Sequence, residues 1–197
     1  MNATTTIPTT HRILVAHRDD DRRGDLQAMI ESIGHVVVGA AGTTREVVSL
    51  ANEANAEVIV SSLRLADGDG IAALLQVARD QPLPSVIVTH RSDLEHVQHA
   101  LEDHVMAYLV EPITAEDLRP TIALVMNRFS QFQDLQKEVE DLKTALAARK
   151  TIERAKGALM KQHGLDEDAA YRMLQKLASA QRRKLAEFAR ALLGDAD

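Results

Sequence analysis

Positive side chains recur at helical spacing in the stretch Arg149-Lys-Thr-Ile-Glu-Arg-Ala-Lys-Gly-Ala-Leu-Met160. On a helix with about 3.6 residues per turn, Lys150, Arg154, Gly157 and Lys161 share one face, and the apolar side chains fall on the opposite face. Such a face offers cations to the phosphates of a nucleic acid, around one position that lacks a Cβ. The alternative is a charged face that is merely solvated, which is common on surface helices.

The charges of the chain are unevenly distributed along its length. Between Arg149 and Arg190 there are 11 Lys and Arg residues against 5 Asp and Glu residues, a net charge of +6, whereas the whole chain carries −6. A basic helical segment on an otherwise acidic protein favours a polyanion as its partner. Nucleic acid is therefore the first candidate for the ligand of this segment.

The same residues carry a resemblance to a known family. The run Arg149-x-x-Ile-x-x-Ala-Lys-Gly-x-Leu-Met160, then His163-Gly, Ala170-Tyr, Leu174 and Arg182-Arg-Lys, resembles the ANTAR domain of the AmiR/NasR transcription antiterminators. The resemblance implies a compact helical domain that binds hairpins in leader transcripts, usually as a dimer, and so prevents a terminator from forming. The RNA-binding residues expected on this basis are Arg149, Lys150, Arg154, Lys156, Gly157, Lys161, Arg182, Arg183 and Lys184.

Three helices are expected in this ANTAR segment, residues 149–197. Gly164 ends the first helix as the residue after its cap, and the acidic residues from Asp166 to Asp168 cap and charge the start of the second. The third begins next to Arg182-Arg-Lys184, where cations oppose the helix macrodipole. Because the macrodipole disfavours these cations at the start of a helix, we expect them to serve another purpose. Phosphate binding is the natural one.

Length and composition limit the class of protein. The 197 residues suit one or two domains, and 45% hydrophobic residues is ordinary for a globular chain. There is no cysteine, which excludes disulfides and is compatible with a reducing cytoplasm. No apolar run approaches the length of a membrane span, and residues 1–10 are polar and Thr-rich. We expect a cytoplasmic protein with no membrane segment, preceded by a disordered lead-in at residues 1–10.

Upstream of the basic segment, short apolar runs alternate with amphipathic stretches. Runs rich in Val and Ile between helices predict a parallel sheet covered on both faces. Five βα units in about 115 residues fit a flavodoxin-like, doubly wound fold with right-handed crossovers. The helix after the third strand is marked by Ala72, Leu75 and Ala78. The expected strands are Ile13–Ala16, Val36–Ala40, Val58–Val60, Val86–Val88 and Ala107–Val110.

Residues 11–128 resemble the receiver domain of response regulators. The features that carry the resemblance are Asp67-Gly-x-Gly-Ile71 after the third strand, Thr89 at the end of the fourth and Tyr108-Leu-Val-Glu-Pro112 at the fifth. In such a domain, the resemblance implies an acidic pair for Mg²⁺, a phosphate-accepting aspartate and a lysine beside the phosphoryl group.

The residues at those positions predict a receiver that is not phosphorylated. His17-Arg18 stand at the acidic pair, Ser62 at the acceptor and Glu111 at the lysine, and only Thr89 matches. A cation repels Mg²⁺, which prefers anionic oxygen ligands. A serine cannot form an acyl phosphate, and a glutamate repels a phosphoryl group. The domain is therefore interpreted as a pseudo-receiver.

Several of these positions allow both a functional and a structural interpretation. Arg18 and Glu111 are expected to form an ion pair across the vacated pocket. His17 and His90 end the first and fourth strands, so both are expected at the carboxyl edge of the sheet. A pH-sensing or metal-binding pair competes there with two structural histidines, which we favour. Asp67-Gly-Asp-Gly is interpreted as a turn and not as a calcium loop. Since no cofactor loop, metal ligand set, acid/base pair or nucleophile elbow is found, we expect no cofactor, no metal and no enzymatic activity.

The segment between the two modules, residues 129–148, is expected to be a coiled-coil helix. Thr114 and Asp117 are candidates for an N-terminal cap, but Pro120 places the start of regular helix at Pro120 itself. Apolar residues follow at alternate spacings of three and four, the a/d pattern of a dimer seam; packing onto the chain's own domain is the alternative. The seam residues are Phe132, Leu135, Val139, Leu142 and Leu146.

Taken together, the expected class is α/β plus all-α: a flavodoxin-like (βα)5 pseudo-receiver, a long coiled-coil helix and a C-terminal three-helix ANTAR domain. The expected function is that of a homodimeric regulator of transcription antitermination that binds hairpins in leader transcripts. A DNA-binding response regulator and a purely protein-interacting scaffold are the alternatives. Control without aspartyl phosphorylation requires a partner, a ligand or the supply of RNA. Resemblance to the family favours sequestration by a ligand-sensing regulatory protein.

Overall fold

The computed structural model describes residues 10–93 and 107–194 of the chain. The expected lead-in, apart from its last residue, and the helix expected after the fourth strand lie outside these residues. The chain divides into two compact units, residues 1–132 and 133–197. Each unit is described by itself below.

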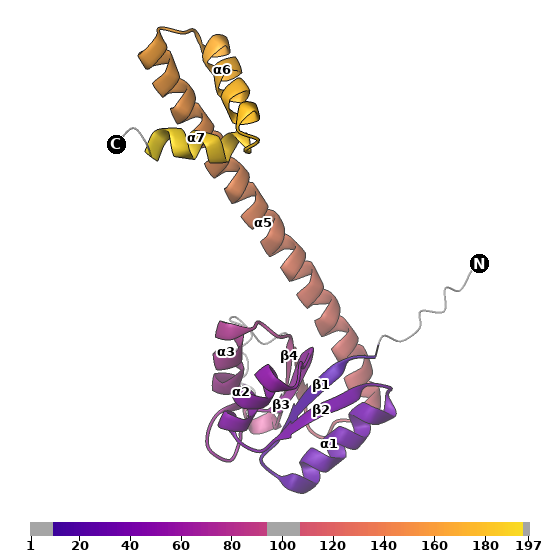
Figure 1. Ribbon diagram of the computed structural model, residues 1–197. Coiled ribbons are helices and arrows are strands. Elements are labelled where there is room, and N and C mark those ends of the chain that lie inside the picture. Colours follow the sequence, from indigo (N-terminus) through magenta and orange to yellow (C-terminus); the bar gives the residue numbers. More distant parts are fainter. Residues whose placement is uncertain (1–9, 94–106, 195–197) are drawn as a thin grey trace, which may run out of the picture. The chain divides into compact units, whose positions relative to one another are not determined.

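The first unit contains a five-stranded parallel sheet with the order β2-β1-β3-β4-β5 (Figure 1). This order is that of a flavodoxin-like fold, in which ligands bind outside the carboxyl ends of the strands where the order reverses. The prediction of five parallel strands and of the fold is confirmed. The strands are β1 (Arg12–Ala16), β2 (Val36–Ala41), β3 (Val58–Ser62), β4 (Ser85–Thr89) and β5 (Ala107–Val110).

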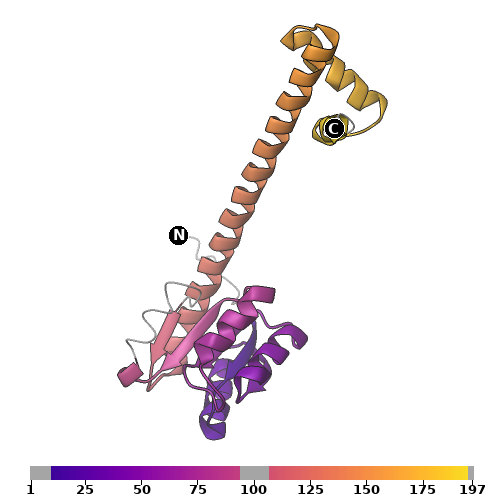
Figure 2. The ribbon, with the colours of Figure 1, turned by 90° about the vertical axis from the view of Figure 1, so that its left-hand side faces the viewer.

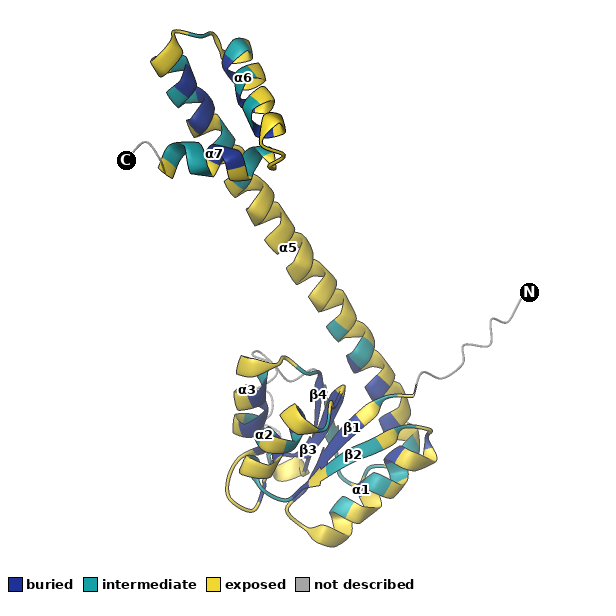
Figure 3. Ribbon diagram, in the orientation of Figure 1, coloured by how far each residue is buried: buried dark blue, intermediate teal, exposed yellow. Residues whose placement is uncertain are grey.

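Two layers of apolar side chains cover the two faces of the sheet, because alternate residues of a strand point to opposite faces. Leu14 and Ala16 pack in the cluster that includes α2 (Thr44–Glu53) and α3 (Gly70–Asp80). Ile13 and Val15 pack in the other cluster, with α1 (Asp20–Ser32) and the first turns of α5 (Ala115–His163). Figure 3 shows buried residues along the strands and on the sheet-facing sides of these helices. A one-turn 3-10 helix, η1, spans Arg91–Asp93.

The face that α3 buries differs from the expected one. The sequence pattern predicts that Ala72, Leu75 and Ala78 form the buried face of this helix, whereas the structure buries Ala73, Leu74 and Val77. Gly70, the first residue of α3, approaches the preceding strand so closely that a Cβ there would lie 2.2 Å from the carbonyl oxygen of Ser62. This approach, which only glycine permits, fixes how the helix is turned toward the sheet.

The start of α5 also differs from the expectation, because the helix begins at Ala115 and Pro120 lies inside it. Thr114 and Asp117 form a reciprocal cap: the Asp117 amide donates to Thr114 Oγ1 at 3.3 Å, and the Thr114 amide donates to Asp117 Oδ2 at 2.9 Å. Leu118 and Ile122 are fully buried against the sheet. The cap and this burial outweigh the backbone hydrogen bond that proline lacks.

The second unit is a bundle of three helices: the C-terminal part of α5, α6 (Glu167–Ala180) and α7 (Leu185–Gly194). As expected, α5 ends at His163 and Gly164 follows with φ +63°, and the side chain of Asp166 caps α6 by accepting from the Ala169 amide at 2.7 Å. Figure 2 shows α5 as one continuous helix. The bundle encloses a small apolar core formed by Ala155, Leu159, Ala170, Leu174, Ala178, Phe188 and Ala189.

Candidate RNA interface and receiver pocket

The exposed face of α5 in the second unit is cationic. Lys150, Arg154 and Lys161 are exposed, and Gly157 stands among them with no heavy atom within 4 Å of where a Cβ would lie. Arg149 joins Lys150 and Arg154 around one shallow hollow on the same helix. The structure therefore brings these cations onto one open surface, with Gly157 as a place where another molecule can approach the helix backbone closely.

Lys156 lies apart from this face, which corrects its grouping with the exposed cations. The side chain is buried, and its Nζ lies 2.5 Å from Glu153 Oε2 and 2.7 Å from Glu167 Oε1. The hydrogen bond to Glu153, followed in size by the one to Glu167, raises the pKa of Lys156. The hydrogen bond between Lys156 and Glu167 also lowers the pKa of Glu167. Lys156 therefore holds the start of α6 against α5 through two carboxylates, and its ammonium is engaged within the protein.

The turn between α6 and α7 presents Arg182, Arg183 and Lys184, all exposed. Arg182 has φ +52°, in the left-handed region, and its amide donates to the Ser179 carbonyl while the Arg183 amide donates to the Ala178 carbonyl, both at 3.0 Å. These two bonds form a Schellman motif, whose left-handed position is usually glycine because a Cβ is disfavoured there. An arginine at this position costs stability in the free domain.

Replacing Arg182 with glycine is expected to stabilise the helical bundle by about 1 kcal/mol, because the left-handed residue loses its Cβ. Amide hydrogen exchange of the full chain measures this, and the amide of Arg183, which donates to the Ala178 carbonyl across the turn, is expected to exchange about fivefold more slowly. Lys184→Gly, two residues further along the chain, is the matched control and is expected to give no gain. Faster exchange in Arg182→Gly would mean that the arginine side chain itself stabilises the turn.

Tyr171 is a candidate contact that sequence reasoning left unplaced. The structure leaves this ring 39% exposed on α6, next to the buried Ala170. Exposed aromatic rings stack on unpaired bases in RNA loops. The helical wheel of α6 would have shown it, since Ala170, Leu174 and Ala178 define a buried stripe that excludes Tyr171.

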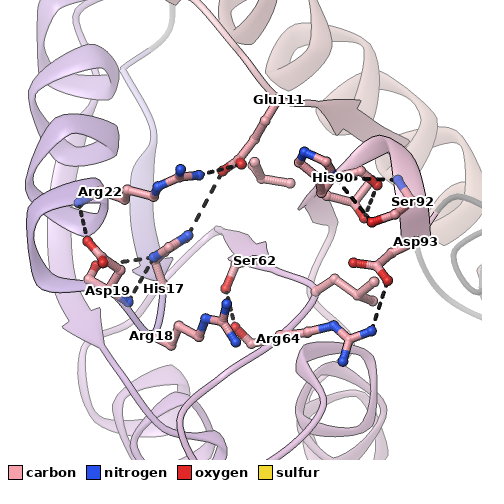
Figure 4. A pocket seen from close by; sticks show the side chains of 13 residues that line it. His17, Arg18, Asp19, Arg22, Ser62, Arg64, His90, Ser92, Asp93 and Glu111 are labelled. Carbon is pink, nitrogen blue, oxygen red and sulfur yellow. Dashed lines mark hydrogen bonds and ion pairs between the residues drawn. The ribbon is translucent and has the colours of Figure 1, made fainter.

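The first unit holds a pocket of about 420 Å³ at the carboxyl ends of β1, β3, β4 and β5 (Figure 4). Its place in the fold is that of the receiver phosphorylation site, so the five residues named from the sequence are brought together. The lining includes His17, Arg18, Asp19, Arg22, Ser62, Arg64, Thr89, His90, Asp93 and Glu111.

Glu111 is neutralised by Arg22 and not by Arg18, which corrects the expected ion pair. Nη1 of Arg22, on the first turn of α1, lies 2.5 Å from Glu111 Oε2, and this hydrogen bond raises the pKa of Arg22. Nε2 of the buried His17 lies 4.0 Å from Glu111 Oε1. The sequence could not distinguish the two arginines, because the direction of each depends on where α1 begins.

The pocket does not fit the Mg²⁺ ion of ordinary receivers. Arg18 brings a cation to the acidic position, and the carboxylate of Asp19 caps α1 by accepting from the Arg22 amide at 3.0 Å. That bond lowers the pKa of Asp19 and keeps it turned to the helix. The hydroxyl of Ser62, at the acceptor position, donates to the Arg64 carbonyl at 2.8 Å. A hard divalent cation needs several anionic oxygens at one point, which these residues do not supply.

Incubation with acetyl phosphate and Mg²⁺ is expected to leave the protein unphosphorylated, because Ser62 cannot form an acyl phosphate and Arg18 opposes the metal. Intact-protein mass spectrometry measures this, with a receiver that carries the acceptor aspartate as the positive control. A phosphate adduct that hydroxylamine removes, located in residues 11–128, would overturn the pseudo-receiver interpretation.

Comparison with known proteins agrees with both units. Residues 13–123 match the family model of the response regulator receiver domain, and residues 140–193 match that of the ANTAR domain. The receiver domain of a modulated diguanylate cyclase from Desulfovibrio desulfuricans G20 has the same fold, with a TM-score of 0.57 and 22% identity over 61% of this chain and 96% of that one. The chain is thus a response regulator that combines a receiver with an ANTAR domain.

Two relatives place it within that class. The transcriptional regulatory protein PdtaR of Mycobacterium tuberculosis is 34% identical over 182 residues, which cover 92% of this chain and 89% of that protein. The nitrate regulatory protein of Klebsiella oxytoca is 39% identical over 72 residues, 36% of this chain and 18% of that protein. The chain belongs to the family of ANTAR response regulators. In the part of the chain that the structure describes, no helix has both the length and the apolar character to span a bilayer.

Proposed function

We propose that this protein regulates transcription by binding RNA hairpins in leader transcripts and preventing a terminator from forming. The observation that carries the proposal is the open cationic face of α5 around Gly157 in a domain of the ANTAR family. Cations on a helix contact the phosphates of a folded RNA, and a position without a side chain lets its backbone approach.

The surface suits a hairpin better than an extended single strand. Single-strand binders stack successive bases on several aromatic rings, and among the described residues of the second unit Tyr171 is the one Phe, Tyr or Trp whose ring is exposed. One ring and several cations fit a short stem, held through its phosphates, with one splayed base of the loop on the ring. We propose that the RNA contacts are Arg149, Lys150, Arg154, Gly157, Lys161, Tyr171, Arg182, Arg183 and Lys184.

The protein is proposed to act as a homodimer through the coiled-coil seam. The five seam residues expose between 44% and 63% of their surface in the single chain, although all are large and apolar. A second copy of the same helix is the partner whose spacing matches. Val139 at an a position between leucines at d favours two strands. A parallel arrangement would set Glu138 opposite Lys143 of the second copy, at the g and e positions that form salt bridges between the helices.

Filter binding with three ligands tests the proposed function: hairpin RNA, duplex DNA of the same sequence, and a denatured form of the same RNA. Hairpin RNA is expected to bind most tightly, with affinity that falls as salt rises. Stronger binding to duplex DNA would make the protein a DNA-binding response regulator. No binding to any of them would leave a protein-interaction scaffold as its function.

Control is proposed to act without aspartyl phosphorylation, because the pocket lacks both the acceptor and the metal ligands. A ligand-sensing regulatory protein that sequesters the regulator in the cytoplasm is the mechanism we favour. Copurification with the products of neighbouring genes, with and without the inducing metabolite, tests it. Release of the regulator by the metabolite is the expected result, and a regulator that binds RNA equally in both conditions would contradict it.

A further inference from the structure

The vacated phosphorylation pocket is lined by three guanidinium groups that come from three different elements. Arg18 follows β1, Arg22 lies on the first turn of α1, and Arg64 follows β3. Figure 4 shows these side chains around an open centre, with Ser62 between them. Ordinary receivers carry acidic residues at this place, and those residues favour a metal cation. The guanidinium groups of this protein favour an anion instead.

Each of these arginines keeps binding capacity for a ligand. Arg22 and Arg64 each engage one carboxylate, Glu111 at 2.5 Å and Asp93 at 2.8 Å, and both side chains are more than half exposed. A guanidinium carries five N–H donors, so most of them remain available. Arg18 takes part in no side-chain hydrogen bond or ion pair with any residue that the structure describes. Arg18 is therefore a cation of the pocket that no ion pair engages, while the carboxylate of Asp19, also in the lining, accepts from the Arg22 amide.

His17 adds a ring nitrogen to the pocket. Its Nδ1 lies 3.0 Å from the Asp19 amide nitrogen and 3.1 Å from the Asp19 carbonyl oxygen, so Nε2 is the nitrogen left for a ligand. Nε2 lies 4.0 Å from Glu111 Oε1, beyond hydrogen-bond length, and the side chain is 10% exposed. When Nε2 carries the ring proton, it donates to a ligand oxygen placed in the pocket, and this hydrogen bond stabilises the bound ligand.

We propose that this pocket binds a small phosphate-bearing ligand reversibly, without Mg²⁺ and without covalent transfer, between Arg18, Arg22 and Arg64. Guanidinium groups that approach from three elements match oxygens that point in three directions, as in a tetrahedral phosphate; the two oxygens of a carboxylate lie in one plane. The volume of about 420 Å³ fits one small molecule, and the charged lining disfavours an apolar one.

Binding at this site exchanges ion pairs within the pocket. A phosphate drawn to Arg22 competes with Glu111, and one drawn to Arg64 competes with Asp93. Glu111 follows β5 directly and stands four residues before Ala115, where α5 begins. The ligand thus changes the partner of a residue in the loop that leads into α5. This site is independent of RNA binding, so its failure leaves the proposed function untouched.

Nuclear magnetic resonance titration of the full-length protein with inorganic phosphate tests the proposal. The amides of Ser62, Arg64 and Thr89 are expected to shift in a saturable manner, equally with EDTA and with Mg²⁺. Arg18→Ala is expected to weaken binding about tenfold or more, a loss of about 1.4 kcal/mol. Arg45→Ala removes the same charge from an exposed site on α2 outside the pocket, and is expected to bind as the wild type does.

The other outcomes overturn the proposal in distinguishable ways. Equal weakening by Arg18→Ala and Arg45→Ala would mean general charge attraction and no site. Binding that requires Mg²⁺ would mean that the pocket retains the metal chemistry of ordinary receivers. Saturable shifts with succinate but not with phosphate would assign the pocket to carboxylates. Absence of any saturable shift in the wild type would mean that the pocket is closed by its own ion pairs.

Discussion

Leu135→Asp combined with Leu142→Asp is expected to convert the protein from a dimer to a monomer. Each fully buried leucine contributes about 1.5–3 kcal/mol to the free energy of association. Both helices of the dimer carry both leucines, so four are lost, and each aspartate buried in the seam costs further energy. Both residues are exposed in the single chain, so the substitution leaves the fold of either unit unchanged. Analytical ultracentrifugation at tens of micromolar measures the oligomeric state.

The same double variant is expected to lose about 100-fold or more in affinity for a leader RNA with two hairpins, because the second hairpin is then no longer bound intramolecularly. Gln133→Asp with Thr144→Asp is the matched control. It adds the same charge at exposed positions of the same helix, outside the a/d seam, and should remain dimeric. If the wild type is a monomer, the dimer seam is contradicted, and its apolar residues pack instead within one chain.

The parts of the fold that follow from local patterns were predictable from sequence. Strands rich in Val and Ile, with buried residues on both faces, stand out as short apolar runs, and Gly164 and Asp166 mark helix ends by chemistry that acts within one turn. The start of α5 was missed because proline at an interior position is normally costly. Burial of Leu118 and Ile122 against the sheet is a tertiary effect that the local sequence does not display.

The pairing of side chains was less predictable than their positions. Sequence placed His17, Ser62 and Glu111 in one pocket correctly, since the carboxyl ends of parallel strands meet at one edge. The predicted ion pair between Arg18 and Glu111 is wrong, because the direction of α1 brings Arg22 to Glu111. Lys156 looked like one more cation beside Gly157, and only its contacts across to α6 distinguish it from the exposed lysines.

Gly157→Leu is expected to abolish hairpin binding while leaving the domain folded. A Cβ at this position meets no atom of the protein, and leucine favours helix over glycine by roughly 0.8 kcal/mol, so the free domain is not destabilised. The side chain would occupy the space that the RNA backbone needs. Hairpin affinity measured by filter binding, with circular dichroism as the test of folding, reports the loss. Gln162→Leu, at an exposed position of α5 outside the cationic face, is the control.

Charge removal is expected to act differently on the same face. Lys150→Ala, Arg154→Ala and Lys161→Ala should each lower the slope of log K against log salt by up to about 0.9, one phosphate contact each. Lys137→Ala, an exposed cation of α5 outside the ANTAR domain, should leave the slope unchanged. The substitution at Gly157 thus tests whether the RNA backbone approaches the helix closely. The three alanine substitutions test whether the cations contact phosphates. If Gly157→Leu and all three charge variants bind as the wild type does, this face is only solvated, and the RNA must bind through another surface, such as Tyr171 or Arg182–Lys184, or not at all.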